Sequence, residues 1–312
     1  MVCGNIGRRA IGSLLAGAIL VSGTGGVSAL TVVGNIDNAN APGTVAGGGS
    51  LGGVFGAVKS FWEAAITDNF TVTVDVSWGG LAGGTLGEHS LVSQTWPGSI
   101  FPPYRETRGS IVLDNDSTSW FVDATPFGAA EWASFNQSAA NLGGGAMNVG
   151  RWFSGAGGDA AGRFDLFSVL LHEVGHALGL SSANRAYQFE TWSDNDIDIS
   201  GSLPFAGAVL ATNNTGVLGD ADFGSNAHLA TANGVEVLMQ QSIGAGKRRH
   251  ASAADILALC QLGAFTGCDI DPPFGEAAAP GSGVRVPEPA SGLVAVAGLG
   301  MLGLLRRRTR RE

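Results

Sequence analysis

The chain has 312 residues, of which 45% are hydrophobic, so it can bury the core of one large domain or two small ones. Its 50 glycines show no Gly-X-Y period, which excludes a collagen-like protein and predicts long loops and β-turns. Acidic residues outnumber basic ones by 26 to 17, and this excess argues against a nucleic-acid partner, because neutralising phosphates requires clustered lysine and arginine.

The first 29 residues have the three parts of a secretory signal peptide. Arg8 and Arg9 precede an apolar stretch at 10–21, and small residues follow up to Ala29, after which we expect cleavage. A transmembrane anchor is the alternative, but the apolar run is short and is interrupted by glycine and serine. The sequence therefore predicts export through the Sec pathway.

Hydrophobic periodicity predicts one helix and three strands before residue 123. Apolar residues recur at helical spacing over 57–66, and β-branched residues alternate over 70–78 until two glycines end the strand. Stretches at 110–113 and 119–122 predict two more strands around an Asp-Asn-Asp turn. The pattern at 127–142 is ambiguous, and we expect it to be partly helical.

The segment 165–180 is predicted to be a buried helix, and it contains two histidines and a glutamate on an otherwise apolar run. Residues 167–182 read FSVLLHEVGHALGLSS. On a helix of about 3.6 residues per turn, His172 and His176 lie on one face, one turn apart, so both imidazoles can reach one metal ion. Gly179 is expected near the end of the helix, where glycine readily adopts a positive φ.

These residue types are the ones that zinc-dependent hydrolysis needs. A catalytic zinc has three protein ligands and a water, so the two histidines leave one ligand to be found elsewhere in the chain. Zinc lowers the pKa of its water toward about 7, and Glu173 is placed beside the ion to accept the proton as a general base. We expect peptide hydrolysis. Two histidines packed in a core are the alternative, but the spacing with glutamate between them favours a metal site.

The motif resembles that of zinc metallopeptidases, and among them that of the matrixin-like metzincins. The resemblance extends over about residues 55–265, with looser similarity at Phe61-Trp62, at the strand 71–78 and at Leu238-Met239. It implies an α+β, zincin-like fold in a domain at 30–271, in which a small mixed sheet packs on the zinc-binding helix, with long loops and a C-terminal helix.

The third metal ligand of that family is missing from its usual place. The matrixin pattern has a histidine where this chain has Ser182, and a neutral hydroxyl is a poor zinc ligand. Of the remaining histidines, His89 precedes the motif helix, and His250 lies beside three basic residues, an unfavourable place for a cation. His228 follows the helix, and a long loop can return it to the ion, so we predict His228 as the third ligand. The alternative is a carboxylate ligand from Glu190, Asp194, Asp196 or Asp198.

Alternating aspartates predict a calcium site, because calcium prefers hard oxygen ligands. The strongest candidate comprises Asp194, Asp196 and Asp198, and shorter pairs occur at 114 and 116 and at 220 and 222. Solvated acidic loops are the alternative. Met239 lies eleven residues after His228. It either marks the metzincin turn beneath the zinc or is a core methionine at the end of a strand at 235–238.

The body is predicted to end in a helix and a disulfide. Residues 183–235 are polar and rich in glycine, so we expect loops with short pieces of structure. Residues 252–262 are predicted to be a helix with Ser252 as its N-cap. Cys260 and Cys268 enclose a short loop and are expected to form a disulfide in an oxidising compartment, whereas Cys3 lies in the signal peptide.

A linker at 272–285 precedes a three-part tail at 286–312. The tail has the sequence Val286-Pro287-Glu288-Pro289, an apolar run at 290–305 and five terminal arginines. It resembles the PEP-CTERM sorting signal of Gram-negative bacteria. This resemblance implies transient anchoring in the inner membrane, recognition by an exosortase-type enzyme, and delivery to the cell surface or extracellular matrix. A permanent single-span anchor is the alternative.

The sequence as a whole predicts a secreted zinc endopeptidase that acts on protein or peptide substrates. The main alternative is a structural or adhesive matrix protein that keeps the zincin fold without catalysis, and Ser182 supports that alternative. Hydrolysis of a non-peptide amide is a further alternative, because the motif specifies a chemistry and not a substrate.

Overall fold

The structure is a computed structural model that describes residues 29–98, 103–213, 226–234 and 236–272. All but the last residue of the predicted signal peptide, nearly all of the linker, and the whole sorting tail lie outside these residues. Among the residues described, no helix combines the length and apolar character that crossing a bilayer requires.

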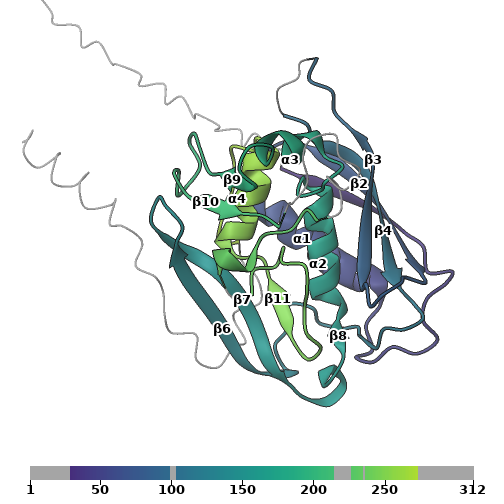
Figure 1. The fold of residues 1–312 in the computed structure, drawn as a ribbon. Coiled ribbons are helices and arrows are strands. Elements are labelled where there is room, and N and C mark those ends of the chain that lie inside the picture. The colour runs from purple at the N-terminus through teal and green to yellow at the C-terminus, as the bar shows by residue number, and fades with distance from the viewer. Residues whose placement is uncertain (1–28, 99–102, 214–225, 235, 273–312) are drawn as a thin grey trace, which may run out of the picture.

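A four-stranded mixed sheet forms one side of the molecule (Figure 1). Its strands are, in spatial order, β1 (Thr31–Ile36), β2 (Thr71–Gly79), β4 (Glu106–Asp114) and β3 (Gly87–Gln94). The first three run parallel, whereas β3 is an antiparallel edge strand. The predicted strands at 70–78 and 110–113 are confirmed as β2 and β4. The sequence analysis missed β3, because its residues GEHSLVSQ are mostly polar and it is buried only in part.

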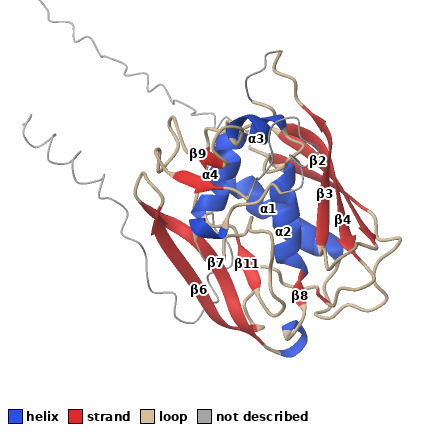
Figure 2. Ribbon diagram, viewed as in Figure 1, coloured by secondary structure: helices blue, strands red, loops and turns tan. Residues whose placement is uncertain are grey.

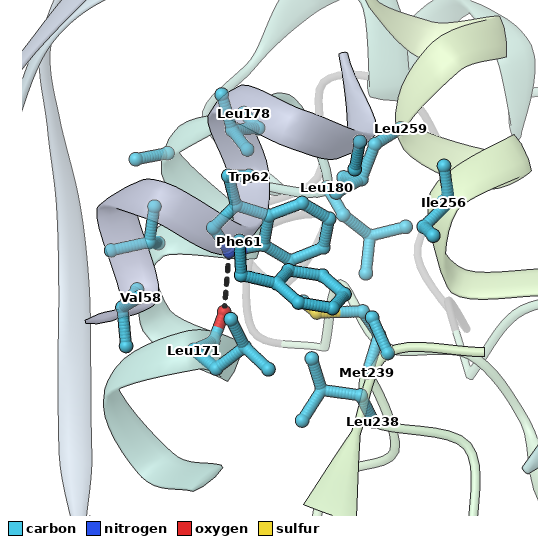
Figure 3. Packing of buried hydrophobic residues seen from close by; sticks show 14 of the residues in the cluster. Val58, Phe61, Trp62, Leu171, Leu178, Leu180, Leu238, Met239, Ile256 and Leu259 are labelled. Atoms are coloured by element: carbon cyan, nitrogen blue, oxygen red, sulfur yellow. Dashed lines mark hydrogen bonds between the residues drawn. The ribbon is translucent and has the colours of Figure 1, made fainter. Parts of the chain in front are cut away.

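Two helices pack against each other and against this sheet. They are α1 (Leu51–Ala65) and α2 (Leu166–Ala177). α1 begins six residues before the predicted start at 57, because the Ser50 side chain caps its first turn by accepting from the Gly53 N–H. Burial of Leu51 and Val54 offsets the poor helix propensity of the glycines in that turn. Trp62 of α1 donates from Nε1 to the Leu171 carbonyl at 3.2 Å, which ties the two helices together (Figure 3).

A second, antiparallel sheet lies on the other side of the helices (Figure 2). Its strands are β6 (Trp132–Asn141), β7 (Ala146–Ala156) and β11 (Arg248–His250). The prediction of helix within 127–142 was therefore wrong. β6 has little apolar alternation of its own, and it is a strand because it pairs with β7 along almost its whole length.

Short strands complete the framework. β5 (Trp120–Phe121), which confirms the predicted strand at 119–122, pairs with β8 (Phe164–Asp165) directly before α2. β9 (Asp196–Asp198) pairs with β10 (Val209–Ala211) in the region after α2, where α3 (Arg185–Glu190) is the one short helix described. This region confirms the expectation of loops with short pieces of structure. Two 3-10 turns occur at Gly158–Ala160 and Thr231–Asn233.

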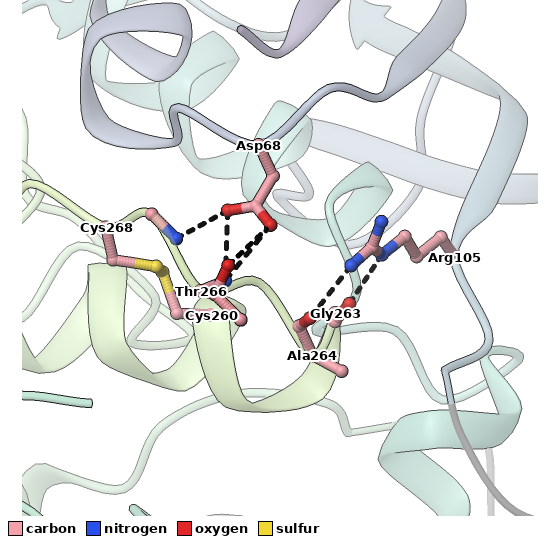
Figure 4. Close-up of a disulfide and its surroundings, with 8 residues drawn as sticks. Asp68, Arg105, Cys260, Gly263, Ala264, Thr266 and Cys268 are labelled. Carbon is pink, nitrogen blue, oxygen red and sulfur yellow. Dashed lines mark hydrogen bonds between the residues drawn. A yellow bond between two sulfur atoms is a disulfide. The ribbon is translucent and has the colours of Figure 1, made fainter. Parts of the chain in front are cut away.

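The C-terminal helix is α4 (Ala253–Leu262), as predicted. Ser252 is its N-cap and forms a reciprocal capping box with Asp255. A disulfide joins Cys260 in its last turn to Cys268. Beside it, Asp68 accepts from the backbone of the 266–267 segment, and Arg105 donates to the carbonyls of Gly263 and Ala264 (Figure 4). The end of α4 is thereby fixed to the α1–β2 connection and to the start of β4.

Candidate metal centre

α2 carries the His-Glu-x-x-His motif, and the N-cap residue before it is held by a buried ion pair. Asp165 is the N-cap and accepts from the Ser168 N–H. The same carboxylate accepts two hydrogen bonds from Arg248, at 3.0 and 2.8 Å, and Arg248 also donates to Asp123. The Arg248 side chain is fully buried. The helix therefore has a fixed start, and at its other end Gly179 has the expected positive φ, 138°.

His172 and His176 face each other across one turn of α2. Their Nε2 atoms are 3.0 Å apart. His172 Nδ1 lies 2.8 Å from the Leu238 carbonyl oxygen, and His176 Nδ1 contacts the Leu180 carbonyl oxygen. A carbonyl oxygen only accepts, so each Nδ1 carries the proton and each Nε2 presents a lone pair. Two lone pairs at this separation repel each other unless a cation lies between them, and a carbonyl behind each ring is the usual partner of a metal-bound histidine.

His228 completes the group. It belongs to the segment after β10, yet its ring centroid lies 5.2 Å from that of His172 and 5.0 Å from that of His176. One ligand nitrogen from each of the three histidines lies within 4.8 Å of the others. Three imidazoles that converge in this way fit zinc, which prefers nitrogen ligands in a tetrahedral arrangement. Ser182 contributes to the wall of the adjoining cavity.

The three histidines are neutral, which metal binding requires. Burial lowers the pKa of His176 to about 4. Burial, together with the proximity of His176, lowers the pKa of His228 to about 3. The pKa of His172 is held well below its usual range by burial, and His176 and His228 add to this effect. No proton therefore has to be displaced at neutral pH before a cation binds.

Glu173 borders the same cavity as the three histidines. Burial raises the pKa of its carboxyl group to about 8, and the nearby Glu88 adds to the shift. A cation beside the carboxylate acts in the opposite direction and favours its charged form. The backbone of Gly87 in β3 comes so close to Glu173 that a side-chain carbon at Gly87 would lie 2.8 Å from the carboxylate.

The cavity has a volume of about 740 Å³. It is lined by residues of β3 and the turn before it, by residues of α2, and by Leu238 and residues 240–243. This size lies within the range of ordinary ligand sites, roughly 300–1,000 Å³. The motif residues therefore open onto a space that can admit part of a substrate.

Met239 lies in a turn beneath α2. It is fully buried, and its sulfur packs so closely against Gly175 that no side chain fits at that glycine. The backbone N–H groups of Leu238 and Met239 donate to the Asp255 carboxylate of α4. Residues 236–239 form bends and turns instead of the strand that was the alternative. The turn also brings the Leu238 carbonyl to His172 (Figure 3 shows the packing around Leu238 and Met239).

The acidic cluster forms where it was expected. Carboxylate oxygens of Asp194, Asp196 and Asp198 lie within 4.8 Å of one another, so this cluster can bind calcium. Burial raises the pKa of Asp196, and its two acidic neighbours add to the shift. Asp114 instead uses its carboxylate to accept from Ser117, Thr118 and Leu81. The pair at 220 and 222 lies outside the described residues.

The other candidate histidines lie elsewhere. His250 is buried in β11 among Phe61, Phe153 and Phe167 and does not join the metal cluster. His89, on β3, borders the cavity but pairs through Nε2 with Glu106 at 2.8 Å. The sequence analysis missed Glu106, Arg248 and the two carbonyls behind the motif histidines. A single sequence does not show which charged side chains will be buried, and it does not show which backbone carbonyl will lie beside a metal-binding histidine.

Part of the chain is similar to a known protein family. The matrixin family model matches residues 91–196, about a third of the chain. The matched segment contains His172, Glu173 and His176 and ends before His228. The chain matched none of the curated proteins. The convergence of three histidines supplies a third candidate metal ligand in place of the histidine that the family pattern has at Ser182. The chain therefore contains a matrixin zinc endopeptidase domain.

Proposed function

We propose that His172, His176 and His228 are the three zinc ligands of this endopeptidase and that Glu173 is its general base. The observation that carries the proposal is the approach of the two motif Nε2 atoms to 3.0 Å, with His228 beside them. An acidic third ligand is not favoured, because the candidate aspartates form a separate cluster.

Each residue then has one task in peptide hydrolysis. Bound zinc supplies an activated water and polarises the scissile carbonyl. Glu173 is the one carboxylate within α2 and borders the cavity, where it would accept the proton of the attacking water and pass it to the leaving amine. The carbonyls of Leu238 and Leu180 hold the imidazoles of His172 and His176 so that Nε2 faces the ion.

The domain is proposed to be one part of an exported protein. Residues 1–29 are the signal peptide, 30–271 the metallopeptidase domain, 272–285 a linker, and 286–312 a PEP-CTERM tail. The tail would hold the chain in the inner membrane until an exosortase-type enzyme releases it to the cell surface or matrix. The Cys260–Cys268 disulfide supports export, because disulfides persist in oxidising compartments.

The test of the catalytic assignment is Glu173→Gln in the domain 30–271, with casein as an unstructured substrate. We expect about one zinc per chain in both proteins and a loss of cleavage of at least about 100-fold in the variant, because general-base catalysis contributes that much or more. Zinc content is measured by atomic absorption. Glu63→Gln, on α1, is the matched control and should cleave like the wild type. Equal activity of Glu173→Gln and wild type would refute the assignment.

A further inference from the structure

A buried polar pair lies behind the candidate metal centre, and the proposed reaction does not use it. His89 Nε2 and Glu106 Oε1 are 2.8 Å apart, and their side chains are 2% and 0% exposed. Glu106 Oε2 is buried and has no hydrogen-bond partner among the residues that the structure describes. Burying a carboxyl oxygen in this way is unfavourable, so a pair that serves only packing would be better replaced by apolar side chains.

The backbone around the pair is shaped to hold it. Register shifts between β3 and β4 at Leu91, Ser93 and Gln94 turn Glu106 toward the interior. Gly109, on β4, leaves room for both side chains, since a side-chain carbon there would overlap Glu106 Oε1 and lie 2.8 Å from His89 Nε2. The register shifts and Gly109 thus both accommodate the His89–Glu106 pair.

The pair packs against one of the proposed metal ligands. The ring of His89 is stacked on that of His176, with centroids 6.2 Å apart and planes inclined by 21°. The separation lies within the range of about 4.5–7 Å at which aromatic rings attract each other. His172 has the matching environment, since it is stacked on His228 at 5.2 Å and 22°. Each motif histidine therefore has one carbonyl at Nδ1 and one imidazole on its face.

We propose that His89 is a positioning residue for His176 and that Glu106 holds His89 in place. The carbonyl of Leu180 holds His176 at Nδ1, and the rings of His172 and His228 meet it edge-on. The His89 ring is the one stacked on the face of His176, so it fixes the plane of the imidazole and orients Nε2 toward the proposed metal position. His89 is outside the cluster of three converging histidines, so it acts through His176. This inference rests on the proposed ligand set.

The experiment measures the zinc dissociation constant by competition with a chromophoric chelator, together with the absorption bands of the cobalt-substituted protein. We expect His89→Ala to weaken zinc binding by about 10- to 100-fold, the usual effect of losing a partner of a metal ligand. Glu106→Leu should weaken it in the same direction. Glu106→Gln should keep the wild-type value, because its amide can still bond to His89 Nε2. The cobalt bands should shift in the first two variants only.

His250→Ala is the matched control, since it truncates a buried histidine away from the metal cluster and should leave zinc affinity unchanged. Wild-type zinc affinity in His89→Ala would overturn the inference, as would equal effects of His89→Ala and His250→Ala. If His89→Ala does not fold, Glu106→Leu and Glu106→Gln test the same role: weaker binding in the leucine variant alone supports it, and equal binding in both overturns it. A wild-type domain that binds no zinc would instead contradict the proposed ligand set.

Discussion

The candidate centre is assembled from histidines with very different positions in the chain. His172 and His176 are brought together by one turn of helix, whereas His228 comes from a segment that reaches the site only after β9 and β10. Its backbone is held there, since the Asn213 N–H donates to the His228 carbonyl and the Leu229 N–H donates to that of Met239. The segment after the acidic cluster thus delivers a side chain that has no ligand motif around it and that the sequence indicated only through comparison with the other histidines.

Replacing His228 by alanine tests this assignment. We expect the zinc content to fall from about one per chain toward zero after dialysis against a weak chelator, with proteolysis lost in parallel, because two nitrogens do not hold a catalytic zinc. Zinc is measured by atomic absorption, and His250→Ala should retain the metal. If His228→Ala keeps its zinc while a variant at Asp194, Asp196 or Asp198 loses it, the third ligand is a carboxylate.

At the scale of elements, contacts with other parts of the protein hold α2 at both ends, independently of any bound metal. Arg248 of β11 reaches across to Asp165 at the helix start, and the turn at 238–239 supports the helix from below. β3 closes the opposite side, with Gly87 against Glu173. A rigid helix of this kind keeps the motif side chains in the geometry that binding and catalysis need.

Breaking the anchor of α2 should be costly. In Asp165→Ala the helix loses its N-cap and Arg248 loses one of its two carboxylate partners, so we expect the free energy of unfolding to fall by about 3–5 kcal/mol. Urea denaturation followed by circular dichroism measures the change. Asp159→Ala, at an exposed aspartate nearby, should differ from wild type by less than about 1 kcal/mol. A similar small effect for Asp165→Ala would contradict the anchoring role.

At the scale of the whole molecule, α1 and α2 lie between the four-stranded sheet and the sheet of β6, β7 and β11, and the site opens beside the edge strand β3 (Figure 2). The disulfide and the contacts of Asp68 and Arg105 close the C-terminal end of the body against the first half of the chain (Figure 4). Residues 30–285 hold 24 acidic and 10 basic residues. A net charge this far from zero favours solubility.

The proposed tail is tested on the full chain. Deleting the segment from Arg306 to Glu312 should impair surface delivery, because the terminal arginines fix the orientation of the apolar run in the membrane. Cell fractionation and surface labelling measure the outcome, with a deletion inside the linker at 272–285 as the control. Equal localisation of the truncated and full-length chains would count against the sorting tail.

The sequence alone determined the features that depend on neighbouring residues. The motif at 172–176 requires one turn of helix, the N-cap at Ser252 and the alternation at 70–78 are local patterns, and each appears in the structure as expected. The zinc chemistry followed from the motif, and the α+β class followed from the family resemblance that the motif carries. Periodicity carries this information because a helix or a strand repeats its contacts within a few residues.

Tertiary structure decided what depends on distant pairing. β6 is a strand because β7 lies beside it, and α1 begins early because its first turn is buried. β3 is a strand because it pairs with β4, and this pairing also brings His89 of β3 to Glu106 of β4. The meeting of His228 with His172 and His176 belongs to the same group. These outcomes depend on free energy gained between segments far apart in the chain, which no local pattern records.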